Sequence, residues 1–422
     1  MVRAAVCFAF IAGCTLAGDK NHCEIQTDCL DGFTCSAAGV CEHATTCTPA
    51  ACDGRCGAIA DDCGGTLACG ACPEHCSNDA RDPSETDVDC GGDCMPCATG
   101  LHCGTTNDCQ TGTCDGGTCR AGRWSTAAPM PTARAELAAV VGLDGRIYAI
   151  GGRTPGGTTA VVEAYDPGDN SWTTRAPMPT PRYGLAATVG ADGTIYAIGG
   201  QYTSVSDAGA SIVAEAYDPM ANTWHALPDL PIGRDDAAAA VGGDGTVYAI
   251  GGFDGLTFQT LGSVATWQSG APSWSVLPDA MTTARSMHVA HVMPDGQIYV
   301  LGGAAGVATP ELSATERYQP GASGWHTLAP MPTPRKALAA AALGARLYAI
   351  GGSRYNGAGI PYTNVVEVFD TSAPAWAQVA SLPTGRYFHA AVAVAGKIYV
   401  LGGRREDLDA TTGTMDVYTP DP

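Results

Sequence analysis

The phrase Ile147-Tyr148-Ala149-Ile150-Gly151-Gly152 returns five more times along the chain with small changes. Its Gly-Gly pairs begin at positions 151, 199, 251, 302, 351 and 402, so successive copies lie 48, 52, 51, 49 and 51 residues apart. A period near 50 residues in a pattern of short apolar strands is typical of β-propeller blades. The phrase therefore predicts a ring of repeated β-sheets over residues 123–422.

The residues around each phrase predict the strands of one repeat. Asp-Gly pairs at 144–145, 192–193, 244–245 and 295–296 suit two-residue hairpin turns that need a positive φ. The strand before each turn is rich in alanine, which fits strands that converge on a central axis. The phrase itself is apolar on both faces, as a strand between neighbouring sheets must be.

A fixed order of residues follows every Gly-Gly pair. A variable loop leads to an aromatic residue and then, in five copies, to a tryptophan. The aromatic residues are Tyr165, Tyr217, Trp267, Tyr318, Phe369 and Tyr418, and the tryptophans are Trp172, Trp224, Trp274, Trp325 and Trp376. This order resembles the kelch repeat and covers residues 123–422. The resemblance implies a kelch-type β-propeller.

The sixth repeat lacks its tryptophan, because the chain stops shortly after Tyr418. The missing part stands at the other end of the repeats, where Trp124 is followed by a Pro-Met-Pro sequence as Trp172 is. A strand around Trp124 should therefore complete the sixth sheet and leave no open edge. We expect an all-β, six-bladed kelch-type propeller closed by an N-terminal strand and preceded by a small disulfide-rich region.

The first residues have the form of a secretory signal peptide over residues 1–13, with Arg3 before a short apolar stretch. Ile11-Ala12-Gly13-Cys14 resembles the bacterial lipobox, which implies lipidation at Cys14 and an anchor in a membrane. The prediction is an exported lipoprotein at the outer membrane or cell surface. The alternative is cleavage after Ala17 or Gly18, which would give a secreted or periplasmic protein.

Residues 14–122 form a predicted cysteine-rich arm. All 20 cysteines lie at or before Cys119, and 18 of them follow Cys14. An exported chain with an even number of cysteines predicts disulfide staples, nine of them here, whose pairing stays open. Two Cys-x-x-Cys motifs (69–72, 94–97) and an acidic run (79–93) leave zinc and calcium as alternatives. We expect neither metal nor any cofactor.

The net charge of −20 excludes one class of partner. Nucleic-acid phosphates bind clustered lysine and arginine, so an acidic chain is a poor match for them. The sequence predicts no nucleic-acid partner.

One arginine precedes the first strand of every repeat. They are Arg134, Arg182, Arg234, Arg285, Arg335 and Arg386. At one register they predict a ring of guanidinium groups near one mouth of the channel, suited to an acidic ligand. In some kelch propellers arginines at this position bind acidic peptides. The alternative is that they pair with a recurring carboxylate, found at Glu163, Glu215, Glu316, Glu367 and Asp416.

The predicted function is a surface-anchored interaction protein whose propeller binds a protein or glycan ligand. The variable loops, with Tyr202, Phe253, Phe258, Tyr355 and Tyr362, fit such contacts. The alternative is a kelch enzyme such as an acidic-sugar mutarotase. Its local pairs would be Arg134 with Glu136, and Arg234 with Asp235 and Asp236. The repeats contain no Ser-His-Asp order, P-loop or His-Glu-x-x-His motif.

Overall fold

A computed structural model describes residues 97–104, 108–109, 114–115, 117–202, 209–306, 309–354, 362–405 and 410–420. Before residue 97 it describes the backbone of six short strands, β1 (Phe8–Phe10), β2 (Gly13–Thr15), β3 (Phe33–Cys35), β4 (Cys41–His43), β5 (Ala58–Ala60) and β6 (Thr66–Ala68). The chain divides into two units, Met1–Ala121 and Gly122–Pro422. The side chain of Cys14, the Cys-x-x-Cys residues other than Cys97 and the acidic run at 79–93 lie outside the described residues.

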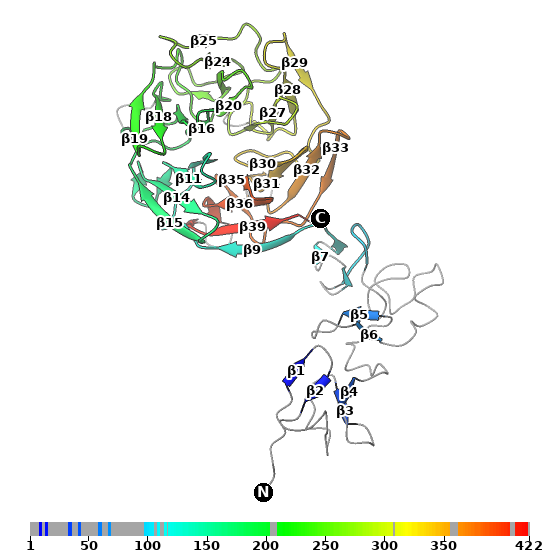
Figure 1. Cartoon of the computed structure of the whole chain (residues 1–422). Coiled ribbons are helices and arrows are strands. Elements are labelled where there is room, and N and C mark those ends of the chain that lie inside the picture. Colours follow the sequence, from blue (N-terminus) through cyan, green and yellow to red (C-terminus); the bar gives the residue numbers. More distant parts are fainter. Residues whose placement is uncertain are drawn as a thin grey trace. The chain divides into compact units, whose positions relative to one another are not determined.

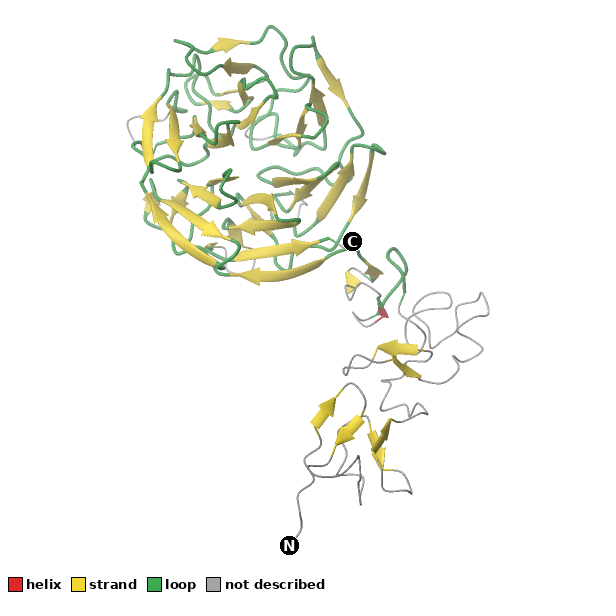
Figure 2. Cartoon of the chain, in the orientation of Figure 1, coloured by secondary structure: helices red, strands yellow, loops and turns green. Residues whose placement is uncertain are grey.

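The second unit is built from six four-stranded antiparallel sheets (Figures 1 and 2). Sheet 1 contains β10 (Ala138–Val141), β11 (Ile147–Ile150), β14 (Val162–Asp166) and β15 (Ser171–Arg175). Sheet 2 contains β16 (Ala186–Val189), β17 (Ile195–Ile198), β18 (Ala214–Asp218) and β19 (Thr223–Ala226). Sheet 3 contains β20 (Ala238–Val241), β21 (Val247–Ile250), β24 (Val264–Trp267) and β25 (Ser275–Val276).

The second half of the ring repeats this plan. Sheet 4 contains β26 (Val289–Val292), β27 (Ile298–Leu301), β28 (Thr315–Tyr318) and β29 (Trp325–Thr327). Sheet 5 contains β30 (Ala339–Leu343), β31 (Arg346–Ile350), β32 (Val366–Asp370) and β33 (Ala375–Gln378). Sheet 6 contains β35 (Ala390–Val394), β36 (Lys397–Leu401), β39 (Met415–Thr419) and β9 (Arg123–Ala127).

Short two-residue strands extend the loops that follow the Gly-Gly pairs. They are β12 (Arg153–Thr154), β13 (Gly157–Thr158), β22 (Phe253–Asp254), β23 (Gln259–Thr260), β34 (Arg386–Tyr387), β37 (Arg404–Arg405) and β38 (Ala410–Thr411). The described residues contain strands and no α-helix. None of them forms a helix with the length and apolar character that a membrane span needs. The prediction of an all-β chain is confirmed.

The repeated phrase forms the second strand of each sheet and lies in the core. All four residues of β11 are buried, since this strand lies between two neighbouring strands and packs on both faces. Ile147 and Ala149 belong to one apolar cluster and Tyr148 and Ile150 to another, and each cluster is shared with an adjacent sheet. The alanine-rich first strands lie innermost and contact one another in succession, with β35 contacting β10. Small side chains there allow six strands to approach one axis.

The first and last strands of the second unit pair in sheet 6. β39 runs antiparallel to β9, with Tyr418 opposite Trp124 and ring centroids 5.1 Å apart. The indole nitrogen of Trp124 donates to the Ala380 carbonyl at 2.9 Å. Trp172 makes the equivalent bond to the Ala128 carbonyl at 2.8 Å. The N-terminal strand therefore supplies the tryptophan that the sixth repeat lacks.

The described end of the first unit carries two disulfides. Cys103 pairs with Cys114, and Cys109 with Cys119, next to the short hairpin of β7 (Cys114–Asp115) and β8 (Thr118–Cys119). Cys103, Cys109 and Cys119 lie close enough together to suggest a metal site by distance, but their sulfurs are already committed to disulfides. Staples are thus the chemistry observed in this part of the arm.

Candidate functional site

The six arginines lie inside the ring and not on its surface. Each is between 0 and 1% exposed. Five of them form ion pairs with the recurring acid, and these pairs are Arg134–Glu163, Arg182–Glu215, Arg285–Glu316, Arg335–Glu367 and Arg386–Asp416. In the sequence, the arginine and the acid recur at fixed positions of these five repeats, and in the structure the residues at those positions form the pairs.

The guanidinium groups also bind the backbone where two strands separate. Arg182 donates to the Gly199 carbonyl at 2.9 Å, to the Val213 carbonyl at 2.6 Å and to Glu215 at 2.6 Å. Burial lowers the pKa of Arg182 and outweighs the opposing attraction of Glu215. The arginine therefore fastens the end of the second strand to the start of the third.

Arg234 is the exception that the sequence singles out, because Ala265 stands where the other sheets have an acid. Its guanidinium donates instead to the Gly251 carbonyl at 2.6 Å and to the Ser263 carbonyl and hydroxyl at 2.8 and 2.9 Å. Burial without a carboxylate lowers its pKa to about 10. Arg234 is as fully buried as the others, so the missing acid does not free it.

These contacts correct the prediction that the six arginines bind a ligand. Their terminal nitrogens are engaged by carboxylates, carbonyls and hydroxyls, and the side chains are buried away from any ligand. The backbone at the same positions is also used, since the second glycine of each pair donates to the carbonyl of the next sheet's arginine. Arginine and Gly-Gly together join neighbouring sheets.

A second ring, two residues beyond the arginines, surrounds the mouth of the channel. Its members are Glu136, Gly184, Asp236, Met287, Ala337 and Phe388. Each backbone N–H donates to the carbonyl of the equivalent residue in the preceding sheet, at 2.8 to 2.9 Å, and Glu136 donates to Phe388. All six residues have φ between 50 and 62°. We call this closed set of hydrogen bonds the mouth ring.

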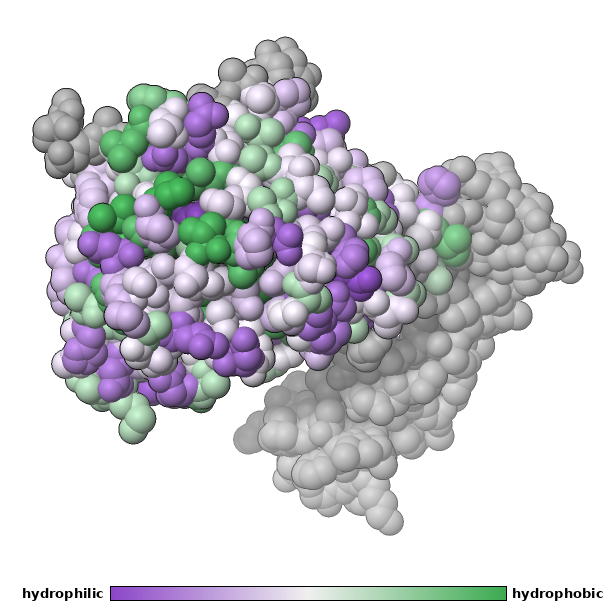
Figure 3. Space-filling model, turned by 90° about the horizontal axis from the view of Figure 1, so that it is seen from above, coloured by the Kyte–Doolittle hydropathy of each residue, from purple (hydrophilic) through white to green (hydrophobic). Residues whose placement is uncertain are grey.

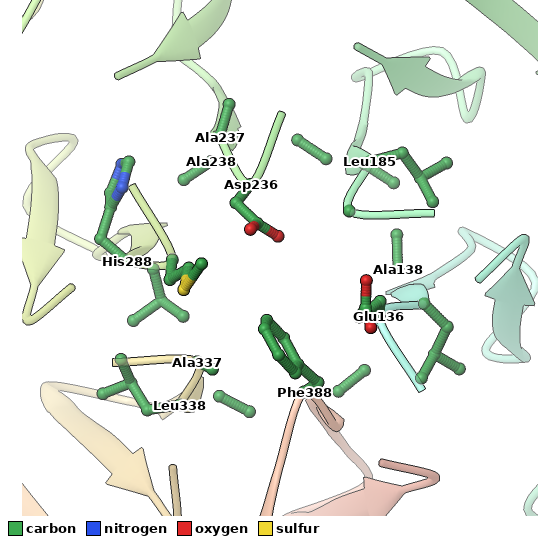
Figure 4. A pocket seen from close by; sticks show the side chains of 18 of the residues that line it. Glu136, Ala138, Leu185, Asp236, Ala237, Ala238, His288, Ala337, Leu338 and Phe388 are labelled. Carbon is green, nitrogen blue, oxygen red and sulfur yellow. The ribbon is translucent and has the colours of Figure 1, made fainter. Parts of the chain in front are cut away.

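The side chains of the mouth ring differ from one sheet to the next. Glu136, Asp236 and Phe388 point towards the centre of the channel (Figure 4). Met287 and Ala337 complete the apolar side of the mouth. The cavity at this mouth has a volume of about 180 Å³ and continues down between the first strands. One side of the entrance is thus acidic and the other apolar.

Asp235 adds a third carboxyl group to the acidic side. Asp235 and Asp236 lie over Gly184, where an added Cβ would come within 2.2 and 3.0 Å of their Oδ1 atoms. Burial and the neighbouring Glu136 raise the pKa of Asp235 to about 7. Burial, Asp235 and Glu136 raise the pKa of Asp236 well above its ordinary value. Glycine at position 184 leaves the space in which these carboxyls gather.

Cationic side chains surround the acidic group without pairing with it directly. Burial raises the pKa of Glu136, while Arg153 and Arg404 oppose that shift. The Arg153 guanidinium stacks over the Tyr183 ring, 4.8 Å from its centroid. Lys336 forms an ion pair with Glu311 at 3.3 Å. Arg153 and Lys336 therefore have partners of their own.

A second cavity adjoins the mouth between sheets 3 and 4 and has a volume of about 220 Å³. It shares Asp236 and Met287 with the first cavity, and Phe253 and Lys336 complete its wall. Phe253, one of the loop aromatics named from the sequence, lines this cavity and meets Phe258, another of them, edge to face. The Ser211 hydroxyl donates to the Tyr202 hydroxyl at 2.9 Å, and the Tyr362 ring contacts the Tyr387 ring. Tyr355 lies outside the described residues.

Two histidines line the upper channel with their rings turned into the sheets. His288 and His389 are each 5% exposed, and burial lowers the pKa of each to about 3. His288 points away from the channel centre in Figure 4. They occupy the place that leucine takes in three other sheets, at Leu137, Leu185 and Leu338. Their surroundings are those of packed core residues.

The rest of the ring surface carries less concentrated features. Figure 3 shows one edge of the ring, where apolar residues gather among hydrophilic ones. At the far ends of sheets 1 and 2, a cavity of about 630 Å³ is bordered by the exposed Leu143 and Met220. The lower channel is lined mainly by alanine and valine, with His291 the one titratable residue among those that line it.

Sequence reasoning named Glu136, Asp235 and Asp236 only as partners of Arg134 and Arg234. The structure brings the three acids together and leaves both arginines out of the group. Phe388 and Met287 were not identified from the sequence, because their register carries six different residues. The signal that could have found them is the fixed distance of two residues from each arginine.

Comparison with known proteins agrees with the repeats and the sheets. The family profile described as "KLHDC2/KLHL20/DRC7 Kelch-repeats domain" matches residues 102–303, and the "Kelch motif" profile matches residues 334–383 and 385–421. Together they match more than half of the chain.

Similar proteins include Kelch-like protein terF of Aspergillus terreus, 29% identical over 67% of this chain and 52% of its own length. Kelch-like protein 35 of Mus musculus is 29% identical over 48% of this chain and 32% of its own length. The chain thus spans about half or less of these relatives. The solved structure of YjhT aligns with a TM-score of 0.60 at 15% identity, over 70% of this chain and 97% of that one. This structural likeness concerns the fold alone. Because both kelch-repeat profiles and the kelch-like relatives match this chain, the chain is a kelch-repeat protein.

Proposed function

We propose that residues 122–422 form a closed six-bladed propeller that binds a protein or glycan ligand at the mouth ring. We further propose that the chain is exported and held at a membrane surface by a lipid on Cys14. The observation that carries the binding function is the contrast between two registers. The arginine register holds the same residue six times, whereas the mouth ring holds six different residues on one backbone conformation.

The backbone of the mouth ring does not require its side chains. A non-glycine residue in the left-handed region costs about 1 kcal/mol relative to glycine, and five of the six positions accept that cost. Glycine would make the same backbone hydrogen bonds, as Gly184 does. Side chains held at such a cost around an open cavity are best explained by contact with a ligand.

A protein ligand agrees with the family, because kelch-repeat proteins generally bind protein partners. An accessible ring of arginines would attract an acidic ligand, but the six arginines are buried. The mouth carries the acids Glu136, Asp235 and Asp236, which would repel such a ligand. We therefore propose recognition through the mouth ring and its adjoining loops, on the rigid support of the sheets.

The test is a glycan and peptide array probed with the full chain and with Phe388→Ala. We expect hits with the wild-type protein that weaken by about tenfold or more in the variant, since a buried aromatic contact of this size contributes roughly 1–3 kcal/mol. Met220→Ser, on the opposite face, should keep them. Hits that persist in Phe388→Ala but disappear in Met220→Ser would place binding elsewhere and reject the mouth as the site.

An enzyme is the second candidate, and one observation favours it. A carboxyl group whose pKa lies at about 7, as burial makes that of Asp235, suits proton transfer at neutral pH. Turnover of an acidic sugar that disappears in Asp235→Asn, with unchanged thermal stability, would support catalysis. A binding protein would instead lose affinity in steps across several mouth variants.

The anchor has its own test. Cys14→Ala should release the protein from the membrane fraction into the soluble fraction of a Gram-negative host, because an acyl chain stabilises membrane binding by about 0.8 kcal/mol per buried CH₂. A Cys7→Ala variant controls for the loss of a cysteine in the same region. Retention of Cys14→Ala in the membrane fraction would reject the lipid anchor.

A further inference from the structure

Three carboxyl groups at the mouth lack the arginine partner that the five acids of the third strands possess. The five acids opposite the arginines all form ion pairs. Among the described residues, Glu136, Asp235 and Asp236 form no ion pair, and Asp235 Oδ1 is buried without a hydrogen-bond partner. Partly buried carboxylates without a counter-ion are unfavourable, so this group is poised to gain from a cation.

The fold gathers these acids from different sheets. Glu136 belongs to sheet 1 and the two aspartates to sheet 3, while Gly184 of sheet 2 provides the space between them. Mutual repulsion contributes to the raised pKa of both aspartates. The acids of the third strands have arginine partners, so the unpaired carboxyls at the mouth are a local feature of the ring.

A single metal ion does not fit the arrangement. Among the described residues, the one group of three potential ligands within 4.8 Å of one another is the disulfide-bonded Cys103, Cys109 and Cys119. The three carboxyls are therefore too far apart to share one ion directly. A larger cation that carries several N–H donors, such as an ammonium or guanidinium group, can reach more than one of them.

The opposite side of the mouth suits the carbon stem of such a cation. Phe388 points into the entrance across from Asp236 and beside Glu136 (Figure 4). Met287 lies between the two adjoining cavities. An aromatic face attracts a cation, and a methionine packs well against methylene groups. The net charge of −20 adds long-range attraction for a basic partner.

We propose that the mouth of the ring binds a basic side chain, lysine or arginine, of a protein partner, with its charge among Glu136, Asp235 and Asp236 and its stem against Phe388 and Met287. This rests on the proposed binding function. Arg153, Arg404 and Lys336 flank the site, and Tyr183 and Glu311 hold two of them.

The test measures binding of short peptides to the full chain by calorimetry. The probe is acetyl-Gly-Gly-Lys-Gly-Gly-amide, with arginine and norleucine in place of lysine as further probes. Lysine and arginine peptides should bind and the uncharged norleucine peptide should not. Asp236→Asn and Glu136→Gln should each weaken binding by about tenfold or more, since a hydrogen bond to a charged group contributes about 1.5–3 kcal/mol. Asp169→Asn, an exposed aspartate at the other end of sheet 1, should not.

Binding should also strengthen as the pH rises from about 6 to 8, because Asp235, whose pKa lies at about 7, loses its proton over this range. Equal affinity for the lysine and norleucine peptides would overturn the proposal. Binding of n-butylammonium as tight as that of the lysine peptide would assign the site to free amines and overturn the protein partner. If array hits depend on Phe388 but not on Asp236, the binding function stands and this inference fails.

Discussion

At the scale of single residues, the arginines and the mouth ring show how position in one repeat separates support from recognition. In five of the six sheets an arginine pairs with an acid inside the sheet, and each pair ties two strands together. Two residues further on, the backbone is again identical six times, but the side chains are free to differ. The arginine register therefore stabilises the sheets, whereas the mouth ring, two residues further on, varies in its side chains.

Removing one of the buried acids should be costly. In Glu215→Ala, Arg182 keeps its charge inside the ring without a counter-ion, and the free energy of unfolding should fall by about 3–5 kcal/mol. Ser263→Ala removes only a neutral acceptor from Arg234 and should cost about 1 kcal/mol. Urea unfolding measures both. A Glu215→Ala protein as stable as Ser263→Ala would contradict the structural role of the pair.

The buried histidines should make the ring sensitive to acid. Burial lowers the pKa of His288 to about 3, so below about pH 6.5 the unfolded chain takes up a proton that the folded chain does not. The free energy of unfolding then falls by up to about 1.4 kcal/mol per pH unit as the pH drops towards 3. His288→Leu, which copies the residue at the same place in sheets 1, 2 and 5, should flatten this slope.

The control for that experiment is His225→Gln, because His225 is exposed on β19. Its unfolding free energy should follow the wild-type dependence on pH. The account of His288 is wrong if His288→Leu and the wild-type protein lose stability in parallel between pH 6.5 and 4.

At the scale of elements, the pairing of β9 with β39 holds the ends of the ring unit together. Trp124→Ala should cost about 2–4 kcal/mol, because the indole packs on Tyr418 and donates to the Ala380 carbonyl. Trp172→Ala, which loses the equivalent contacts with Tyr165 and the Ala128 carbonyl, should cost a similar amount. Thermal unfolding of both variants checks this equality.

Deletion of residues 123–131 is the stronger form of the same experiment. It removes β9 and leaves β39 as an unpaired edge, so the melting temperature should fall by several degrees or more. A deletion protein that melts like the parent would show that sheet 6 does not depend on its N-terminal strand.

Much of the arrangement of strands could be predicted from the sequence, because the same pattern of residues repeats along the chain. Each Gly-Gly pair marks the end of a buried strand, and the missing tryptophan after Tyr418 points to Trp124. The disulfides Cys103–Cys114 and Cys109–Cys119 could not be predicted, since spacing alone permits many pairings. Nor could the gathering of Glu136, Asp235 and Asp236, because hydrogen bonds between sheets, and not any pattern within one repeat, bring them together.

At the scale of the whole molecule, a ring of packed sheets supports one mouth whose side chains differ from sheet to sheet. The arginines, although identical and conspicuous in the sequence, are inside the scaffold. The side chains that remain accessible around the channel are acidic on one side and apolar on the other. The proposed anchor at Cys14 would hold the protein at a membrane surface.

The most direct test of this account compares ligand affinity of the full chain before and after changes in the mouth ring. Lysine-peptide binding should weaken by about tenfold or more in Asp236→Asn and in Phe388→Ala, and should stay within about twofold of wild type in Asp169→Asn. Unfolding free energies measured in parallel should show that all three variants remain folded. Unchanged affinity in both mouth variants would contradict the claim that recognition takes place there.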